Sequence, residues 1–439
     1  MLPLAEFSAT FNCTVTGSDL RPTTSASNFR FALDGSTDAA RLLSEAKCIV
    51  YSSAISSNHP AMQEARTTGK KIMHRSDLLA IFTETFKTMA VAGTHGKSTT
   101  SAMVSHVLQT CGLSPSWIIG APFANSQAAF CRGTSDFLVI EADESDGSFL
   151  KYSPFVSIIN NIELDHLDFY KTFDRVEAAF RSFISRTSSA GGLVYPFEDE
   201  ALRRIAGEWR GNVSCFGKSK LAAFQFLNSS SRGLMSKVEF LFAGRRFGFS
   251  LPMPGQHNIL NALAAIAACN LVAVDPAESC KALESFPGVA RRLQRYPSPD
   301  GRMIFDDYAH NPGKIKSCLL GLRDAFPERR LIAVFQPHRF TRISSLYDQF
   351  VRAFAVPNTC VVVLPVYAAG EAAQTGFEPE RIARDIAGTA AVQTFAAQTL
   401  KEASDLVESI IDRNLDLVVT LGAGDIWRVA ENLAHGSQP

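Results

Sequence analysis

The chain has 439 residues, of which 46% are hydrophobic and 20% charged, and its formal net charge is zero. This length exceeds one hydrophobic core and favours about three domains. The balanced charge gives no support to nucleic-acid binding, and no apolar run approaches the roughly 18 residues of a membrane span. We therefore expect a globular protein with neither nucleic acid nor membrane as a partner. The nine scattered cysteines lack a CxxC pair and suit reduced thiols in a cytoplasmic protein.

Residues 1–86 predict a small α/β unit. The runs 14–16 and 48–51 are predicted strands, and the first ends in a polar turn at 17–19. Ligands in open α/β sheets gather at the carboxyl ends of strands, so the turns after both runs are candidate ligand edges, although simple turn chemistry explains them equally well. Residues 2–7 predict a helix with no strand before it.

Residues 87–294 form the largest predicted unit, which starts with a strand at 88–92 and a helix from Ser101 onward. Between them lies a loop with residues Gly93, Thr94, His95, Gly96, Lys97, Ser98 and Thr99. A strict Walker A motif has a glycine at the position of Val91, so only the shorter pattern is present. Backbone N–H groups at the start of a helix, together with Lys97, favour a site for nucleotide phosphates over a structural glycine turn.

Two predicted strands of the same unit, 137–140 and 156–159, deliver polar side chains at their carboxyl ends. Glu141 follows the first strand and His166 comes after the second. Beside a phosphate loop these two residues, with Ser98, are candidate ligands for Mg²⁺, which takes few protein ligands and keeps water. The alternatives are a solvated acidic turn and a structural histidine.

Further along, Asn258 and Asn261 lie three residues apart at the start of a predicted helix and share one face. Their amides could pair with a purine edge, although Asn258 would serve equally well as a helix cap. The stretch 288–294 has the character of a linker and carries Arg292. A guanidinium at a hinge could clamp phosphates when domains close, and a solvated basic linker is the equal alternative.

Residues 295–439 again alternate between apolar runs and polar ends. The predicted strands are 303–305, 331–335, 360–364 and 417–421. Four such runs are typical of a parallel sheet with one functional edge. Arg339 and Arg342, with Tyr308 and His310, would suit a carboxylate.

Ten stretches, in this order, resemble the Mur ligases, the ATP-dependent amide-forming enzymes of bacterial cell-wall synthesis, and most closely their alanine-adding branch. The stretches are 17–19, 52–55, 92–97, 141–146, 161–166, 257–265, 291–294, 306–310, 335–342 and 366–371. The resemblance spans nearly the whole chain. It implies an α/β fold with a UDP-sugar domain (1–86), a central P-loop-type ATPase domain (87–294) and a C-terminal Rossmann-like domain (295–439).

The resemblance also implies roles for single residues. The loop from Gly93 to Thr99 would hold the phosphates of ATP, and Asn258 and Asn261 would contact adenine. Mg²⁺ would be bound by Ser98, Glu141 and His166. Lys97, His166, Arg292 and Asp307 would act in catalysis, the last two by engaging ATP on domain closure. Substrate contacts would come from Ser52, Ser53, Tyr308, His310, Arg339 and Arg342.

The implied reaction joins L-alanine to UDP-N-acetylmuramate in the cytoplasm. ATP would convert the lactyl carboxylate into an acyl phosphate, and the amine of L-alanine would displace the phosphate. Lys97 and Mg²⁺ would offset the repulsion between the two anions. Closure of the third domain would keep water from the acyl phosphate. The sequence does not predict an oligomeric state or the selectivity for alanine over serine or glycine.

Three departures from the family pattern bear on these expectations. Other branches hold a second Mg²⁺ with a carbamylated lysine, but no lysine occurs between Lys171 and Lys218, so none is expected here. The family has an aspartate where this chain has Pro365. Met1 falls where the family's glycine-rich turn ends, so the first strand and the diphosphate-contacting glycines are expected to be missing from 1–86.

Two alternative functions remain open at this point. One is the family branch that joins a recycled murein peptide to the same sugar nucleotide. The other is a catalytically impaired remnant that binds nucleotide and acts through partners.

Overall fold

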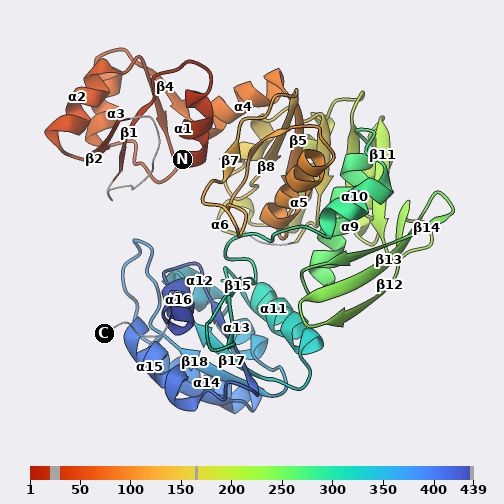
Figure 1. The fold of residues 1–439 in the computed structure, drawn as a ribbon. Helices are drawn as coiled ribbons and strands as arrows, with labels where there is room; N and C mark the ends of the chain where they lie inside the picture. Colours follow the sequence, from red (N-terminus) through yellow and green to blue (C-terminus); the bar gives the residue numbers. More distant parts are fainter. Residues whose placement is uncertain (20–29, 164–166, 436–439) are drawn as a thin grey trace.

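The computed structural model describes residues 1–19, 30–163 and 167–435. Figure 1 shows three α/β units that follow one another along the chain, in red, in orange to green, and in teal to blue. Each unit has its own strands, and no strand is shared between units within the described ranges. The predicted α/β class is confirmed. None of the helices in these ranges is both long and apolar enough to span a membrane.

The N-terminal unit contains two separate pairs of parallel strands. Its elements are α1 (Leu2–Ala9), β1 (Thr16–Asp19), β2 (Arg30–Leu33), α2 (Thr37–Glu45), β3 (Cys48–Tyr51), α3 (Pro60–Thr67), β4 (Lys71–His74) and α4 (Arg75–Thr85). The predicted helix at the start and the strand at 48–51 are confirmed. The predicted strand at 14–16 and turn at 17–19 are wrong, because β1 continues to Asp19 in parallel pairing with β2. Gly17 pairs with Phe31, and a Cβ at Gly17 would lie 3.0 Å from the ring of Phe31.

The central unit is built on a ten-stranded sheet with the order β14-β13-β12-β11-β10-β9-β5-β8-β6-β7. Its strands are β5 (Lys87–Ala92), β6 (Ser116–Ile118), β7 (Phe130–Cys131), β8 (Phe137–Glu141), β9 (Val156–Ile159), β10 (Gly192–Pro196), β11 (Asn212–Gly217), β12 (Phe224–Arg232), β13 (Met235–Phe242) and β14 (Arg245–Leu251). Its helices are α5 (Lys97–Thr110), η1 (Ser148–Lys151), α6 (Leu167–Tyr170), α7 (Phe173–Ser185), α8 (Glu200–Glu208), α9 (Gln256–Asn270) and α10 (Pro276–Leu283). The strands from β11 to β8 pair in parallel, whereas β12, β13 and β14 form an antiparallel end.

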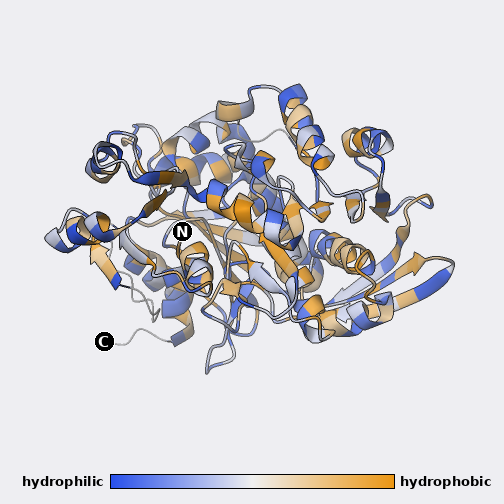
Figure 2. Ribbon diagram, turned by 90° about the horizontal axis from the view of Figure 1, so that it is seen from above, coloured by the Kyte–Doolittle hydropathy of each residue, from blue (hydrophilic) through white to orange (hydrophobic). Residues whose placement is uncertain are grey.

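The middle strand β5 is buried on both faces of this sheet. Met89 and Val91 pack in one core with α5 and α9, and Ala90 and Ala92 pack in a second core with α4 and α7. Such a strand lacks the alternation of polar and apolar residues seen in half-exposed strands. The helices in Figure 2 alternate between hydrophobic and hydrophilic residues, as expected where one face lies on a core. The loop that follows β5 therefore starts from a strand packed on both faces.

The C-terminal unit is a six-stranded sheet with the order β15-β16-β20-β17-β18-β19, parallel except for β15. Its strands are β15 (Gln294–Tyr296), β16 (Met303–Asp307), β17 (Arg330–Phe335), β18 (Thr359–Val363), β19 (Gln393–Ala396) and β20 (Asp416–Leu421). Its helices are α11 (Pro312–Ala325), α12 (Phe340–Ser345), α13 (Tyr347–Ala353), α14 (Pro379–Ala390), α15 (Leu400–Ile410) and α16 (Trp427–His435). Separate apolar cores cover the two faces of the sheet. The four predicted strands are confirmed.

In the connection between the central and C-terminal units, two consecutive residues bind to different units. Ala290 donates its backbone N–H to Pro122 O of the central unit at 2.9 Å. The side chain of Arg291 instead binds Asp306 of the C-terminal unit at 3.1 Å, and its φ is +59°. We propose that the hinge lies at this point, a few residues before the predicted boundary at 294. The boundary at 86 likewise stays a prediction.

Candidate active site

The phosphate loop connects β5 to α5 in a conformation that only glycine accommodates at two positions. Gly93 has a φ of +126° and Gly96 a φ of +82°. A Cβ on Gly96 would lie 2.4 Å from Asn261 Oδ1 and 2.6 Å from Asn160 Nδ2. Gly96 is also the N-cap of α5, so no side chain caps the first N–H groups of this helix. An uncapped helix start after a buried parallel strand is suited to bind an anion.

The loop is held against the residues that follow β9. Asn161 Oδ1 accepts the backbone N–H of His95 at 2.9 Å, and Thr94 Oγ1 accepts the backbone N–H of Glu163 at 3.0 Å. The His95 ring also lies 3.2 Å from Glu163 Oε2. Asn160 Nδ2 donates to the His95 carbonyl at 3.1 Å. These bonds fix the loop before any ligand is bound, which reduces the ordering needed on binding.

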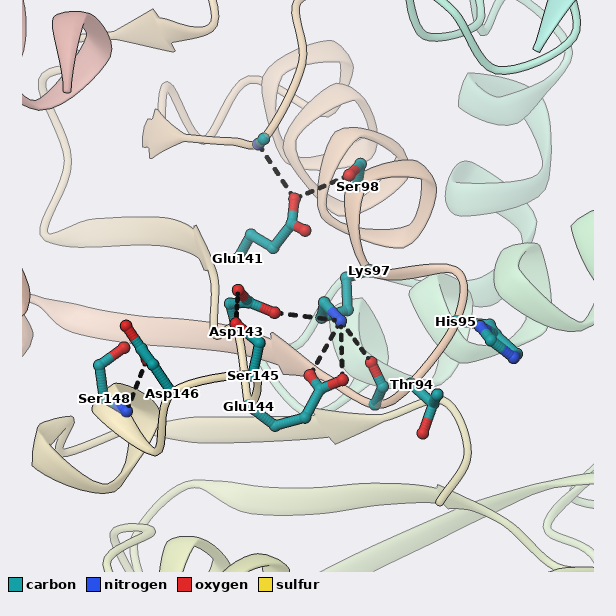
Figure 3. Close-up of polar contacts among 12 residues, drawn as sticks. Thr94, His95, Lys97, Ser98, Glu141, Asp143, Glu144, Ser145, Asp146 and Ser148 are labelled. Atoms are coloured by element: carbon teal, nitrogen blue, oxygen red, sulfur yellow. Dashed lines mark hydrogen bonds and ion pairs between the residues drawn. The ribbon is translucent and has the colours of Figure 1, made fainter. Parts of the chain in front are cut away.

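Lys97 lies at the centre of the polar cluster in Figure 3. Its Nζ donates to Gly93 O and to Glu144 Oε2, each at 2.8 Å, and lies 3.5 Å from Asp143 Oδ1. Burial alone would lower the pKa of Lys97, but Glu144 and Asp143 outweigh it and raise the pKa above 10.5. The lysine is therefore charged and bound to carboxylates in this form of the protein. A phosphate would compete with Glu144 for the same ammonium group.

Ser98 and Glu141 form the second part of the cluster. Ser98 Oγ donates to Glu141 Oε2 at 2.8 Å, and the same carboxylate oxygen accepts the Gly120 N–H at 3.1 Å (Figure 3). Hydroxyl and carboxylate oxygens are the ligands that Mg²⁺ prefers, so the two residues fit such an ion. Within the described residues there is no group of three or more His, Cys, Asp or Glu side chains placed to hold a metal. The third predicted ligand, His166, lies outside those residues.

The two predicted adenine contacts lie on α9, and both are buried. Asn258 is not the helix cap, which is Gly255, and its Nδ2 donates to Pro254 O at 2.8 Å. Asn261 reaches Gly96 instead, so α9 supports the back of the phosphate loop. Burial, with a smaller effect of His95, lowers the pKa of the adjacent His257 to about 4. His257 is therefore neutral at physiological pH.

The C-terminal unit contributes Arg292 and Asp307 to the same region. Arg292 Nη2 donates to Ser98 Oγ at 3.3 Å across the hinge. The Asp307 carboxylate accepts the backbone N–H groups of Leu293 and Ala309, each at 2.8 Å. Burial raises its pKa to about 6, although Arg292 lowers it in part. The ring of Tyr308 lies about as close to the guanidinium of Arg292 as to that of Arg291, at 5.1 and 4.9 Å.

His310, His338 and Arg342 form a group next to Tyr308. His310 Nδ1 donates to Tyr308 O at 2.8 Å, so this tautomer leaves Nε2 as an acceptor. Burial and the charges of Lys314 and Arg342 lower the pKa of His310 well below 6.5. Arg342 Nη1 donates to His338 Nδ1 at 3.1 Å. Neutral imidazoles beside a guanidinium can accept hydrogen bonds from an amine while the guanidinium holds a carboxylate.

A cleft of about 1100 Å³ brings these parts together. It is lined by residues of all three units, and the predicted site residues among them are Thr94, His95, Gly96, Lys97, Ser98, Thr99, Glu141, Asn258, Asn261, Arg292, Asp307, Tyr308, His310 and Arg342. Gly93 lies one residue before this lining and supplies a carbonyl to Lys97. The lining residues, of which Met1 is the first and Arg342 the last along the chain, thus face one volume large enough for a nucleotide and a second substrate.

Three predicted substrate residues do not line this cleft. Ser52 and Ser53 follow β3, and Ser53 Oγ donates to Asp146 Oδ2 of the central unit at 3.1 Å. Arg339 is the N-cap of α12, with a φ of +68°, and its backbone N–H binds Tyr367 O at 2.9 Å. Their roles in substrate binding stay predictions.

Sequence reasoning missed Glu144 and Arg291. Glu144 is one of four acids within 141–146, and no sequence signal distinguishes the acid that accepts the hydrogen bonds of Lys97 from the other three. Arg291 stands beside the predicted Arg292, but its side chain turns to Asp306 and to the carbonyls of Gly422 and Gly424. Only the tertiary structure shows that the two arginines have different hydrogen-bond partners.

Comparison with known proteins identifies the family. Family models match three consecutive parts of the chain: the Mur ligase family catalytic domain at residues 1–87, the Mur ligase middle domain at 91–269, and the Mur ligase glutamate ligase domain at 291–424. The departures noted above do not prevent a match in any of the three parts.

Two relatives with similar sequences and one solved structure are named for the same reaction. The chain is 34% identical to a UDP-N-acetylmuramate–L-alanine ligase of Desulfosudis oleivorans, over 100% of this chain and 96% of that protein. A protein of the same name from Syntrophobacter fumaroxidans is 36% identical over 88% of this chain and 82% of its own length. The crystal structure of UDP-N-acetylmuramate-alanine ligase MurC from Thermotoga maritima matches with a TM-score of 0.82 and 26% identity, covering 99% of this chain and 95% of that one. On these matches, and with the phosphate loop and the three-unit cleft in place, the chain belongs to the Mur ligase family.

Proposed function

We propose that the protein joins L-alanine to UDP-N-acetylmuramate at the expense of ATP, in the synthesis of peptidoglycan precursors. The observation that carries the proposal is the single cleft that holds the phosphate loop at one end and the group of Tyr308, His310 and Arg342 at the other. The relatives named for this reaction match nearly the full chain, which supports the same activity here.

Lys97 and the N–H groups of α5 bind the phosphates of ATP. Once Lys97 exchanges Glu144 for a phosphate, its charge offsets the repulsion between the γ-phosphate and the incoming lactyl carboxylate. Ser98 and Glu141 would hold Mg²⁺, which would supply further charge neutralisation. Similar structures include a MurF ligase from Thermotoga maritima in complex with ADP, at 18% identity and a TM-score of 0.68, a match that supports the fold alone.

The reaction then runs in two displacements. A lactyl carboxylate oxygen attacks the γ-phosphorus, and ADP leaves. The amine of L-alanine attacks the acyl carbon, and inorganic phosphate leaves with that oxygen while the amine loses a proton. Arg342 holds the carboxylate of alanine, and the neutral His310 accepts a hydrogen bond from its amine, which orients the nucleophile. Arg292 closes the hinge over Ser98 and excludes water from the acyl phosphate.

Two other functions are less well supported. A murein peptide ligase of Psychrobacter arcticus has a similar fold, with a TM-score of 0.69, but is only 22% identical. A remnant that merely binds nucleotide is disfavoured because the described cleft is lined by Lys97, Ser98, Glu141, Arg292 and Arg342. The cytoplasmic location stays a prediction.

Release of inorganic phosphate tests the proposal. The protein is given ATP, Mg²⁺ and UDP-N-acetylmuramate, and L-alanine is compared with an L-alanyl tripeptide. We expect phosphate release to depend on L-alanine. Stimulation by the tripeptide alone would establish the peptide ligase, and no stimulation by either would favour the remnant.

A further inference from the structure

Arg75 is a cation in the cleft for which neither sequence motif nor reaction has given a role. It is the first residue of α4, and it lines the cleft together with Leu79, one helical turn further along the same face. Among the described residues of the N-terminal unit, it is the one lysine or arginine side chain in the lining. The apolar Leu4 of α1 lines the cleft as well. A guanidinium next to aliphatic side chains suits a ligand with both an anionic and a non-polar part.

Asp146 of the central unit holds Arg75 in this place. Arg75 Nη2 lies 3.7 Å from Asp146 Oδ2, and about a third of each side chain is exposed. A guanidinium carries five N–H donors, and a carboxylate at this distance does not saturate them. Burial would raise the pKa of Asp146, but hydrogen bonds from Ser148 and Ser53 and the charge of Arg75 lower it overall. Asp146 is therefore ionised at neutral pH.

The loop that carries Asp146 also carries Glu144, the partner of Lys97 (Figure 3). Its backbone is fixed at both points: Tyr170 donates to Glu144 O at 2.6 Å, and Asp146 Oδ1 accepts the Ser148 N–H at 3.0 Å. One short loop thus contacts the cation of the N-terminal unit and the cation of the phosphate loop.

We propose that Arg75 binds the anionic part of the sugar nucleotide, and that Asp146 is a positioning residue that aims its guanidinium into the cleft. The inference deepens the proposed function and rests on it, since it assigns the sugar nucleotide to the N-terminal end of the cleft. The anionic group is either the diphosphate or the lactyl carboxylate. Both accept paired hydrogen bonds from a guanidinium.

Direct binding to the full chain tests the assignment. Calorimetric titration with UDP-N-acetylmuramate compares the wild type with Arg75→Ala, Arg75→Lys and Arg41→Ala. Arg41 is the matched control, because it is an exposed arginine of the same unit, paired with Asp38 and outside the cleft lining. We expect Arg75→Ala to weaken binding about 10- to 100-fold, as for loss of a charge-assisted hydrogen bond, and Arg75→Lys to weaken it less. Arg41→Ala should bind like the wild type.

Two further measurements separate binding from folding and identify the anion. The KM for ATP should stay within about twofold in Arg75→Ala, because the phosphate loop is untouched. UDP-N-acetylglucosamine lacks the lactyl carboxylate, so an equal loss of affinity for both nucleotides assigns Arg75 to the diphosphate. A loss confined to UDP-N-acetylmuramate assigns it to the carboxylate. Asp146→Asn should raise the KM for the sugar nucleotide without lowering kcat, and Asp146→Glu should restore it in part.

The inference is overturned if Arg75→Ala binds UDP-N-acetylmuramate as tightly as the wild type, or no worse than Arg41→Ala. An equal rise in the KM for ATP would also overturn it, since that pattern indicates general damage to the cleft. If the wild type itself binds no UDP-N-acetylmuramate, the proposed function fails instead, and the two failures are thereby distinguished.

Discussion

Lys97 binds acidic side chains in this structure, and under the proposed function it would bind the phosphates of ATP instead. Its ammonium is buried and shared between Glu144, Asp143 and the Gly93 carbonyl. Removing one partner from a buried ion pair leaves the other without compensation, which is costly for folding. Any test of Lys97 must therefore separate a loss of chemistry from a loss of stability.

We predict that Lys97→Ala lowers kcat by at least about 10²- to 10³-fold, because a preorganised charge at the transferring phosphoryl group is lost. The thermal midpoint should fall as well, since the buried carboxylate of Glu144 loses the ammonium group that compensates its charge. The double variant Lys97→Ala, Glu144→Gln should recover the midpoint and stay inactive. Turnover near the wild-type rate in either variant would remove the phosphate role from this loop.

Asp307 gives a prediction on pH. Its pKa in the folded protein is about 6, above the usual 3.8, because burial disfavours the carboxylate. The folded state thus binds the proton more tightly than the unfolded state between these values, and the stability that this contributes is lost as pH rises through about 6. Between these two pH values, we expect the unfolding free energy of the wild type to fall by up to about 3 kcal/mol relative to that of Asp307→Asn. The thermal midpoint of the wild type should fall with it. Asn loses one of the two backbone hydrogen bonds at every pH, so only the slope is diagnostic. Parallel profiles would contradict the raised pKa.

At the scale of elements, the turn between β5 and α5 depends on Gly96. The chain offers a matched control at the other end of the same helix, since Gly112 follows α5 with the same φ of +82°, and a Cβ on Gly112 would meet no atom within 4 Å. Gly112→Ala therefore measures the backbone strain alone, about 1–2 kcal/mol. Gly96→Ala adds the collision with Asn261 and Asn160.

We predict that Gly96→Ala lowers the thermal midpoint more than Gly112→Ala and raises the KM for ATP, whereas Gly112→Ala leaves that KM unchanged. Both variants are compared in one thermal melt and one ATP titration. Equal effects of the two substitutions would mean that the loop yields to a side chain, and that its contact with α9 is not needed for nucleotide binding.

The elements near the site were largely predictable, and their contacts were not. Continuous apolar runs predicted β5, β8, β9 and the parallel strands of the C-terminal unit, because strands buried on both faces consist of such runs. In the N-terminal unit, β1 was misplaced because its extent is set by pairing with β2, whose residues lie outside the local sequence pattern. For Asn258 the sequence left a purine contact and a helix cap equally open, and the structure places the cap at Gly255. Local patterns cannot determine which distant backbone a residue meets.

The site shows the same division between motif and contact. The residues from Gly93 to Thr99 and Glu141 were predicted because the chemistry needs those types in that order. The contact of Arg75 with Asp146 joins segments about 70 residues apart in different units, and no sequence motif predicts it. The stretch 288–294 was predicted to be a linker, and the boundary at 294 stays a prediction. The hydrogen bonds to the two flanking units, which support our proposed hinge at Ala290 and Arg291, have no signal in the sequence.

For the whole molecule, function depends on three units meeting at one cleft. The central unit supplies Lys97, the C-terminal unit supplies Arg292 and Asp307, and the N-terminal unit supplies Arg75. The hydrogen bond from Arg292 to Ser98 shows that the C-terminal unit contacts the phosphate loop directly. Under the proposed function, ATP, sugar nucleotide and amino acid would bind to separate walls of one volume.

The most direct measurement follows one oxygen atom through the reaction. UDP-N-acetylmuramate with a heavy oxygen isotope in both lactyl carboxylate positions is turned over with ATP and L-alanine, and the products are analysed by mass spectrometry. Activation as an acyl phosphate predicts one heavy oxygen in the inorganic phosphate for each amide formed, with the other retained in the product. Unlabelled phosphate accompanying amide formation, or label recovered in AMP, would contradict this account.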